Sequence, residues 1–91
     1  MSKVQDWRER YGVAHFTYRG QAWTAVEVDG NTMGLEGLRL SISGAFGDYP
    51  TPGIAERVLD DFDRCVGLKA EGRWELQGQH WVQVSTGRLG A

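Results

Sequence analysis

The sequence is poor in the residues that build disulfides, metal sites and membrane spans. It has one cysteine and two histidines among 91 residues, which excludes an internal disulfide and a zinc site of the usual Cys/His spacing. No apolar run approaches the roughly 18 residues that a spanning helix needs, and the N-terminal segment lacks the apolar stretch of a secretory signal. We therefore expect a cytoplasmic protein with no metal, no cofactor and no membrane association.

A large excess of charge of one sign is also missing. Ten Lys and Arg residues against 12 Asp and Glu give a net charge of −2, which argues against a dedicated binder of the nucleic-acid backbone. Arginines outnumber lysines eight to two, a bias typical of GC-rich bacterial genomes. The hydrophobic share of 41% and the charged share of 24% are those of an ordinary globular domain, so the chain is expected to fold.

The length fits one domain. We assign residues 1–85 to it and residues 86–91 to a flexible C-terminal tail. At the start of the chain, Ser2 and Gln5 are spaced as in a capping box, and helical spacing continues through Val4, Trp7 and Tyr11. These two signals predict a short helix over residues 3–11.

Alternating apolar and polar residues predict four strand regions. They cover residues 13–18, 22–28, 38–43 and 73–84. The first two form a hairpin, and the last contains a whole hairpin by itself. The region at 38–43 presents Leu38, Leu40 and Ile42 to the interior. The glycine-rich segment 29–37 is assigned no strand.

The register of the first hairpin depends on its loop. A three-residue loop places Phe16 opposite Thr24 and collects the apolar side chains on one face. A two-residue loop places Phe16 opposite Trp23 and splits that face. Because burial generally decides register, we prefer the three-residue loop in both hairpins, which directs Trp23 and Trp81 away from the apolar face.

The strongest pattern in the chain is an amphipathic helix. Thr51 and Pro52 form an N-cap and a first-turn proline, and Gly67 offers a C-terminal stop. One arc of this helix is apolar, with Ile54, Ala55, Val58, Leu59, Phe62, Cys65 and Val66. We therefore predict an α+β domain in the order α-β-β-β-α-β-β, with an antiparallel sheet of about five strands packed on this one long helix.

Two outward tryptophans need an explanation, because one indole buries about 150 to 250 Å² of surface. Three explanations stay open. The first helix covers one of them, or both belong to a surface that binds a partner protein or a second copy of the chain, or the register is wrong and they lie in the core.

Other side chains extend the predicted binding surface. The segment 44–53 has no periodicity, and its residues Phe46 and Tyr49 serve either as anchors or as a small local core. Arg73 falls on the same predicted face as the two tryptophans. The helix adds a secondary acidic surface, formed by Glu56, Asp60 and Asp63.

Catalytic signals are weak. Cys65 falls on the apolar arc, where a thiol packs as a small hydrophobe. His80 comes near Glu75 in one register, as a base does beside its orienting carboxylate. No nucleophile lies in a recognisable elbow beside it, so no residue is assigned a catalytic role.

The sequence therefore predicts a small non-catalytic protein-interaction domain, with a homodimer as one form of the interaction. Two alternatives remain. One is a binder of single-stranded nucleic acid that uses outward Trp and Arg side chains, which the net negative charge disfavours. The other is a small enzyme that uses His80 with Glu75.

Overall fold

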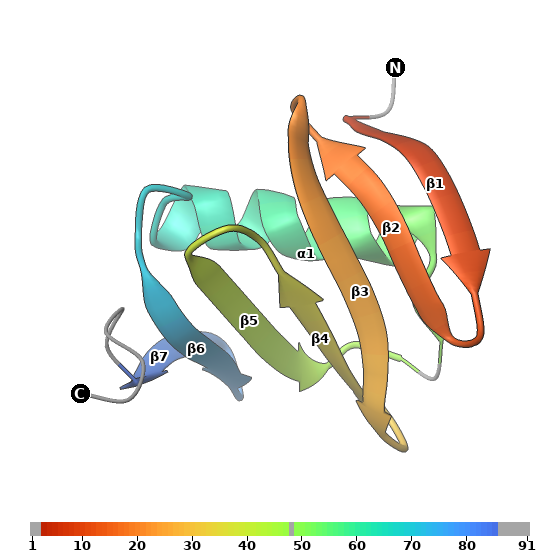
Figure 1. Ribbon diagram of the computed structural model, residues 1–91. Helices are drawn as coiled ribbons and strands as arrows, with labels where there is room; N and C mark the ends of the chain where they lie inside the picture. Colours follow the sequence, from red (N-terminus) through yellow and green to blue (C-terminus); the bar gives the residue numbers. More distant parts are fainter. Residues whose placement is uncertain (1–2, 48, 86–91) are drawn as a thin grey trace.

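The computed structural model describes residues 3–47 and 49–85. Within them, one mixed sheet of seven strands packs on one 14-residue helix (Figure 1). The chain forms these elements in the order β1 (Val4–Arg10), β2 (Val13–Tyr18), β3 (Gln21–Asp29), β4 (Thr32–Glu36), β5 (Leu40–Ala45), α1 (Pro52–Cys65), β6 (Gly72–Gln77) and β7 (His80–Ser85).

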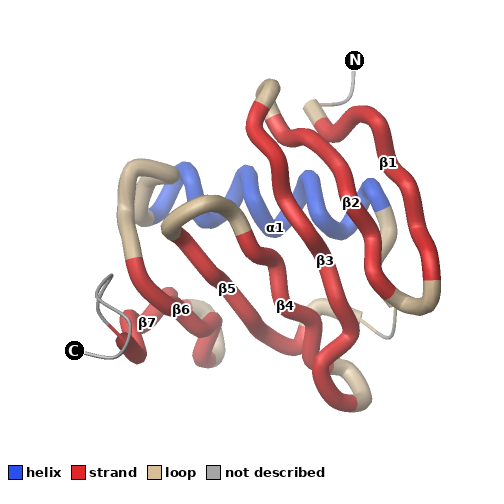
Figure 2. Tube along the Cα trace, in the orientation of Figure 1, coloured by secondary structure: helices blue, strands red, loops and turns tan. Residues whose placement is uncertain are grey.

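The strands follow one another in the sheet as they do in the chain, from β1 at one edge to β7 at the other. β1 to β5 form an antiparallel meander. α1 then crosses one face of the sheet, behind the strands in Figure 2, and returns the chain so that β6 pairs parallel to β5. β7 is antiparallel to β6. The predicted five-stranded antiparallel sheet and the order α-β-β-β-α-β-β are therefore wrong.

The first error is at the N-terminus, where a strand replaces the predicted helix over residues 3–11. β1 pairs with β2, but the register shifts around Asp6, whose φ is 59°. This bulge turns Val4 and Trp7 toward the core side although they are three residues apart. The inward-facing residues of this irregular strand are therefore spaced as they would be in a helix. Ser2, part of the predicted capping box, lies outside the described residues.

The second error concerns the middle of the sheet. β4 lies in the segment 29–37, which was assigned no strand, and it buries Met33 and Leu35. A glycine at its centre interrupts the alternation of side chains by which strands are recognised. β5 begins at Leu40, so Leu38, which was predicted to face the interior, lies in the preceding turn and is 92% exposed.

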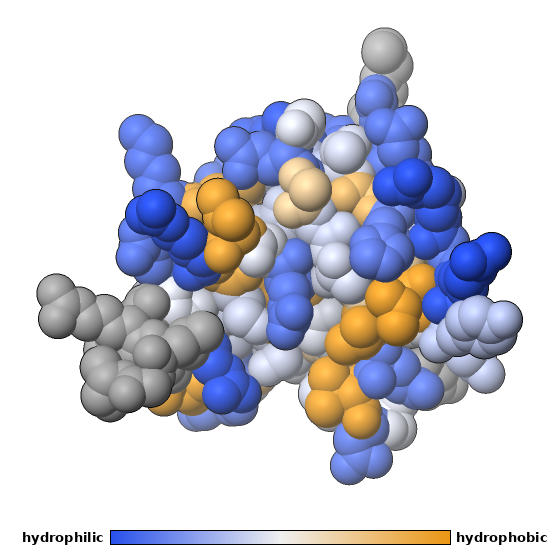
Figure 3. All heavy atoms as spheres, viewed as in Figure 1, coloured by the Kyte–Doolittle hydropathy of each residue, from blue (hydrophilic) through white to orange (hydrophobic). Residues whose placement is uncertain are grey.

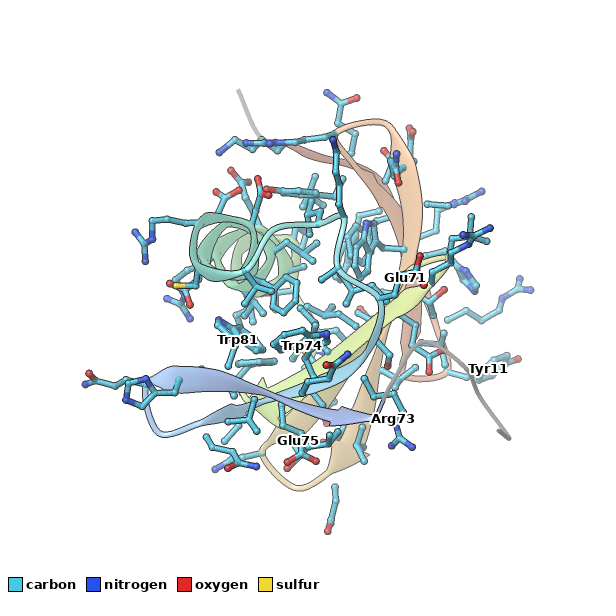
Figure 4. The ribbon with its side chains drawn as sticks, turned by 90° about the vertical axis from the view of Figure 1, so that its left-hand side faces the viewer. Tyr11, Glu71, Arg73, Trp74, Glu75 and Trp81 are labelled. Carbon is cyan, nitrogen blue, oxygen red and sulfur yellow. The ribbon has the colours of Figure 1, made fainter. Side chains whose placement is uncertain are left out.

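The third error is the hairpin register. β2 and β3 are joined by the two-residue turn Arg19-Gly20, whose φ angles of 52° and 81° are typical of a type I′ turn. Phe16 therefore pairs with Trp23, which faces the helix and is 6% exposed. The β6–β7 hairpin also has a two-residue loop, and Trp81 points toward α1 (Figure 4). The register is set by the two-residue turn, whose backbone twist matches that of the sheet. The number of apolar residues collected on one face, on which the prediction relied, does not set it.

The core lies between α1 and the sheet. Ala14 and Ala25 are cross-strand partners, and together with Ala55 of the helix they are completely buried. Their small side chains allow the helix and the sheet to approach closely. The largest fully buried side chains of the same cluster are Phe16, Tyr18, Leu35, Ile42, Leu59 and Phe62. The view along the sheet in Figure 4 shows that the strands curve around the helix.

The predicted start and end of the helix are confirmed. Oγ1 of Thr51 accepts a hydrogen bond from the backbone N–H three residues later at 3.2 Å, and Pro52 is the first helical residue. Beyond the last turn, Gly67 has a φ of 108° and donates its N–H to the carbonyl of Phe62 at 3.0 Å. Cys65 was expected in the core but is exposed, because other residues already complete the buried stripe of α1: Ala55, Val58, Leu59 and Phe62.

Two aspartates tie the polar side of α1 to the first strands. Asp60 accepts hydrogen bonds from the buried hydroxyl of Tyr18 and from Nζ of Lys3, which lies 3.0 Å away. Asp63 accepts from Arg19 at 3.0 Å. Two of the three members of the predicted acidic surface thus bind cations of the same chain.

The charge state of Asp60 is coupled to folding. Burial acts to raise the pKa of its carboxyl, but the hydrogen bonds from Tyr18 and Lys3 outweigh burial and hold the pKa below its ordinary value of 3.8. Burial, and after it the Asp60 carboxylate, raises the pKa of Tyr18. Because the pKa of Asp60 is lower in the folded state, its stabilising contribution is complete above pH 3.8 and disappears as the pH falls through the folded value.

We predict that Asp60→Asn lowers the free energy of unfolding near neutral pH by about 1 to 2 kcal/mol, because it weakens a charged hydrogen bond to a buried hydroxyl. The difference from the wild type should shrink below pH 3.8, where Asp60 itself becomes protonated. Urea unfolding across this pH range measures the effect. Asp29→Asn, at the exposed end of β3, is the control. A difference that stays the same at every pH would contradict this assignment.

Candidate functional site

The two predicted anchors of a binding surface lie on the inner face of the sheet. Trp81 is half-buried, with its Nε1 donating to Oδ2 of Asp61 at 2.9 Å and its ring edge-on to that of Phe62 at 5.0 Å. Figure 4 shows Trp74 and Trp81 directed toward the helix. Since Trp23 is buried as well, the outward surface predicted around Trp23 and Trp81 is not formed. Trp74 and Trp81 instead pack against Phe62 of α1, and Trp23 belongs to the buried core.

The other predicted binding residues lie apart from one another. Phe46 packs against the core with its ring 6.1 Å from that of Trp81, whereas Tyr49 of the same loop is 66% exposed. Arg73 and Glu75 point away from the helix, on the outer side of the β6–β7 hairpin (Figure 4). Phe46 and Arg73 are therefore on opposite faces of the sheet.

The candidate acid–base pair is not assembled either. His80 pairs across the hairpin with Gln77, and Glu75 pairs with Val82. Glu75 accepts a hydrogen bond from Nε2 of Gln77 at 3.3 Å. Within the described part of the chain, His80 is exposed and forms no hydrogen bond with Glu75.

Among the cavities near charged side chains are the following two. One, of about 520 Å³, lies where the β4–β5 turn meets the start of β6 and is lined by Leu38, Arg39 and Arg73 among others. The other, of about 390 Å³, lies along the exposed side of α1. Neither is lined by His80 or Cys65, the two residues that were considered for catalysis.

The face of the sheet opposite α1 carries exposed apolar side chains. A cross-strand row runs from Arg10 through Val13 and Val26 to Gly34. A Cβ on Gly34 would lie 3.3 Å from Val28 and 3.7 Å from Val26, so both valines lie against the glycine, and Val28 is 59% exposed. Figure 3 shows hydrophobic side chains over the lower parts of β2 and β3.

Tyr11 lies in the turn between β1 and β2 and is 94% exposed. Its φ is 55° and that of Gly12 is 77°, as in a type I′ turn, where Asn or Gly is preferred. This conformation costs a bulky residue about 1 kcal/mol or more. Arg19 has the same conformation, but it binds Asp63 and lies 5.5 Å above the ring of Tyr18. Tyr11 has no such compensating contact with the described residues.

Two arginines precede Tyr11 in β1. Arg10 begins the cross-strand row that contains Val13 and Val26, and Arg8 pairs with His15 on the same face. The ion pairs found in residues 3–47 and 49–85 involve other cations, so the charges of Arg8 and Arg10 are not neutralised there. We name this surface the β1–β3 patch and define it as Arg8, Arg10, Tyr11, Val13, Val26 and Val28.

Comparisons with protein-family models, with curated proteins and with solved structures found no match to the chain. Among the described residues, no three His, Cys, Asp or Glu side chains gather as metal ligands do. No helix in this part of the chain is long and apolar enough to span a bilayer. Geometry is therefore the basis for assigning the β1–β3 patch.

This patch was not predicted, because the helical spacing of residues 3–11 placed Tyr11 in a helix. A signal for the correct structure was present. Tyr11-Gly12 and Arg19-Gly20 each separate two segments in which apolar and polar residues alternate. A residue followed by glycine in that position is typical of a two-residue hairpin turn.

We predict that Tyr11→Asn raises the free energy of unfolding by about 0.5 to 1 kcal/mol, because Asn adopts positive φ at less cost than Tyr. The matched control is Arg19→Asn, which removes the same backbone cost but also the contacts with Asp63 and Tyr18, and therefore should not stabilise. Thermal and urea unfolding of both variants measure the effects. Loss of stability in Tyr11→Asn would show that the tyrosine supports the fold.

Proposed function

We propose that this chain is a non-catalytic protein-interaction domain and that its β1–β3 patch binds an acidic surface of a partner protein. One observation carries the proposal: Tyr11 is 94% exposed and keeps a backbone conformation that disfavours tyrosine. A residue that costs stability and forms no hydrogen bond, ion pair or ring contact with the described residues is expected to contribute to binding.

The composition of the patch supports this reading. Tyr and Arg are among the residue types enriched as anchors in protein interfaces. The guanidinium groups of Arg8 and Arg10 offer paired donors that match carboxylates. Beside them, Val13 and Val26 provide apolar area on a rigid sheet. Burial of Tyr11 and the valines would supply affinity, and the arginines would select an acidic partner.

The two alternatives have less support. A binder of single-stranded nucleic acid stacks successive bases on several aromatic side chains along a basic groove. On the outer side of the described structure, Tyr11 is the aromatic side chain available for stacking, and it lies at one end of the sheet. Two of the arginines that such a groove would use, Arg19 and Arg39, are paired with Asp63 and Glu71. The enzyme reading lacks the hydrogen bond between His80 and a carboxylate on which it relied.

Photo-crosslinking in the cells that naturally produce the chain tests the proposal. With p-benzoylphenylalanine in place of Tyr11, we expect a protein adduct that mass spectrometry maps to an Asp- and Glu-rich segment of the partner. The matched control carries the same probe in place of Tyr49, the other exposed tyrosine, and should give no such adduct. Arg8→Glu combined with Arg10→Glu should abolish the adduct at position 11 by charge repulsion.

Three results would contradict the proposal. The first is an absence of adducts from position 11. The second is an equal yield from position 49. The third is an adduct destroyed by nuclease and resistant to protease, which would favour nucleic acid as the partner.

A further inference from the structure

The two edges of the sheet differ in how well they are protected. β1 carries a bulge at Asp6 and three consecutive charged residues, Arg8, Glu9 and Arg10. Bulges and charges are the devices by which natural sheets prevent edge strands from pairing with other chains. β7, with the sequence HWVQVS, contains no lysine, arginine, carboxylate or proline. The β6–β7 ladder has a register shift of its own, between Arg73 and Trp74, which makes β7 irregular beyond Gln83. The segment Trp81–Gln83 comes before that shift, so this regular and uncharged part of the β7 edge is open to strand addition.

The geometry of the β6–β7 hairpin defines which backbone groups face that edge. Gln77 and His80 flank the two-residue loop and are the pair that hydrogen-bonds across it. Because bonded and non-bonded pairs alternate along an antiparallel ladder, Trp81 and Gln83 direct their N–H and C=O groups outward. Within the described residues, β7 has β6 as its one neighbour in the sheet.

Side chains hold this edge in place. On the inner face, the indole of Trp81 is fixed by its hydrogen bond to Asp61. Nε2 of Gln83 donates to the carbonyl of Glu71 at 3.0 Å. On the outer face, Val82 is 37% exposed. The strand is thus ordered before any partner arrives, which lowers the entropy cost of pairing.

We propose that β7 pairs antiparallel with β7 of a second copy of this chain, about a two-fold axis at Val82. In this register Trp81 of each copy lies opposite Gln83 of the other, so the outward backbone groups form four hydrogen bonds. The two Val82 side chains meet at the axis as a close, non-hydrogen-bonded pair. A second copy is the occupant that this edge fits, because the uncharged sequence places no like charges opposite each other.

The difference between the edges also limits the assembly. Pairing of β7 with β1 of another copy would repeat without end and give filaments, whereas pairing of β7 with β7 closes after two copies. The bulge and charges of β1 block the first arrangement. The contact is small, so a weak dimer is expected. This proposal uses a different surface from the β1–β3 patch and does not rest on it.

Sedimentation equilibrium from about 10 μM to about 1 mM, the range in which small interfaces associate, tests the dimer. We expect the mass to rise toward that of two chains. Val82→Lys places two like charges at the axis and should weaken dimerisation by about tenfold or more. Val82→Thr, which keeps the β-branched shape without charge, should retain it. Val28→Lys, on the same face but in β3, is the matched control and should leave it unchanged.

Amide hydrogen exchange supplies a second measurement. The N–H groups of Trp81 and Gln83 should become protected as concentration increases. A monomer at the highest concentration would overturn the proposal, and protection that is independent of concentration would show that the edge is covered within one chain. Equal loss of dimer in Val82→Lys and Val28→Lys would place the contact on the β1–β3 patch instead.

Discussion

The fold depends on one helix that covers one face of a seven-stranded sheet. Phe62 is at the centre of this arrangement, with its ring 5.6 Å from that of Trp74 and 5.0 Å from that of Trp81, both edge-on. A single 14-residue helix cannot cover a flat sheet of this width. The sheet therefore curves, and its bulky aromatic side chains fill the space between the outer strands and the helix.

This division leaves the two faces with different properties. The inner face holds the large aromatic and aliphatic side chains, and the outer face holds valines, short polar side chains and charges. Among the described elements, candidates for binding are thus restricted to the outer face, the exposed side of α1, the turns and the two edges. The β1–β3 patch and the β7 edge lie at opposite ends of the strand order, so the two proposed contacts would not exclude each other.

Some of the fold followed from sequence because the signals were local. The cap at Thr51 and the terminating Gly67 located the helix, and alternation located β2 and β3. The remaining features depended on interactions that a local pattern does not encode. Alternation along the strand allowed either face of the sheet for Trp23. The geometry of the turn at Arg19-Gly20 decides between the two faces. The bulge at Asp6 gave a strand the spacing of a helix.

The candidate site was predicted less well for the same reason. Tryptophans attract attention in a sequence, but their large area makes them equally suited to the core. A one-residue change of register moved Trp23 and Trp81 from the surface to the interior. Tyr11 was informative only when its backbone conformation was known, since the strain that marks it is a property of the folded turn.

The aspartates of α1 have a consequence for how substitutions on this helix are judged. A helical wheel shows Asp60, Asp61 and Asp63 as ordinary solvent-facing residues. In the folded chain, Asp60 and Asp63 anchor the N-terminal hairpin, while Asp61 anchors the indole of the last strand. Replacing one of these carboxylates therefore weakens the attachment of α1 at one end of the sheet and leaves the polar contacts at the other end in place.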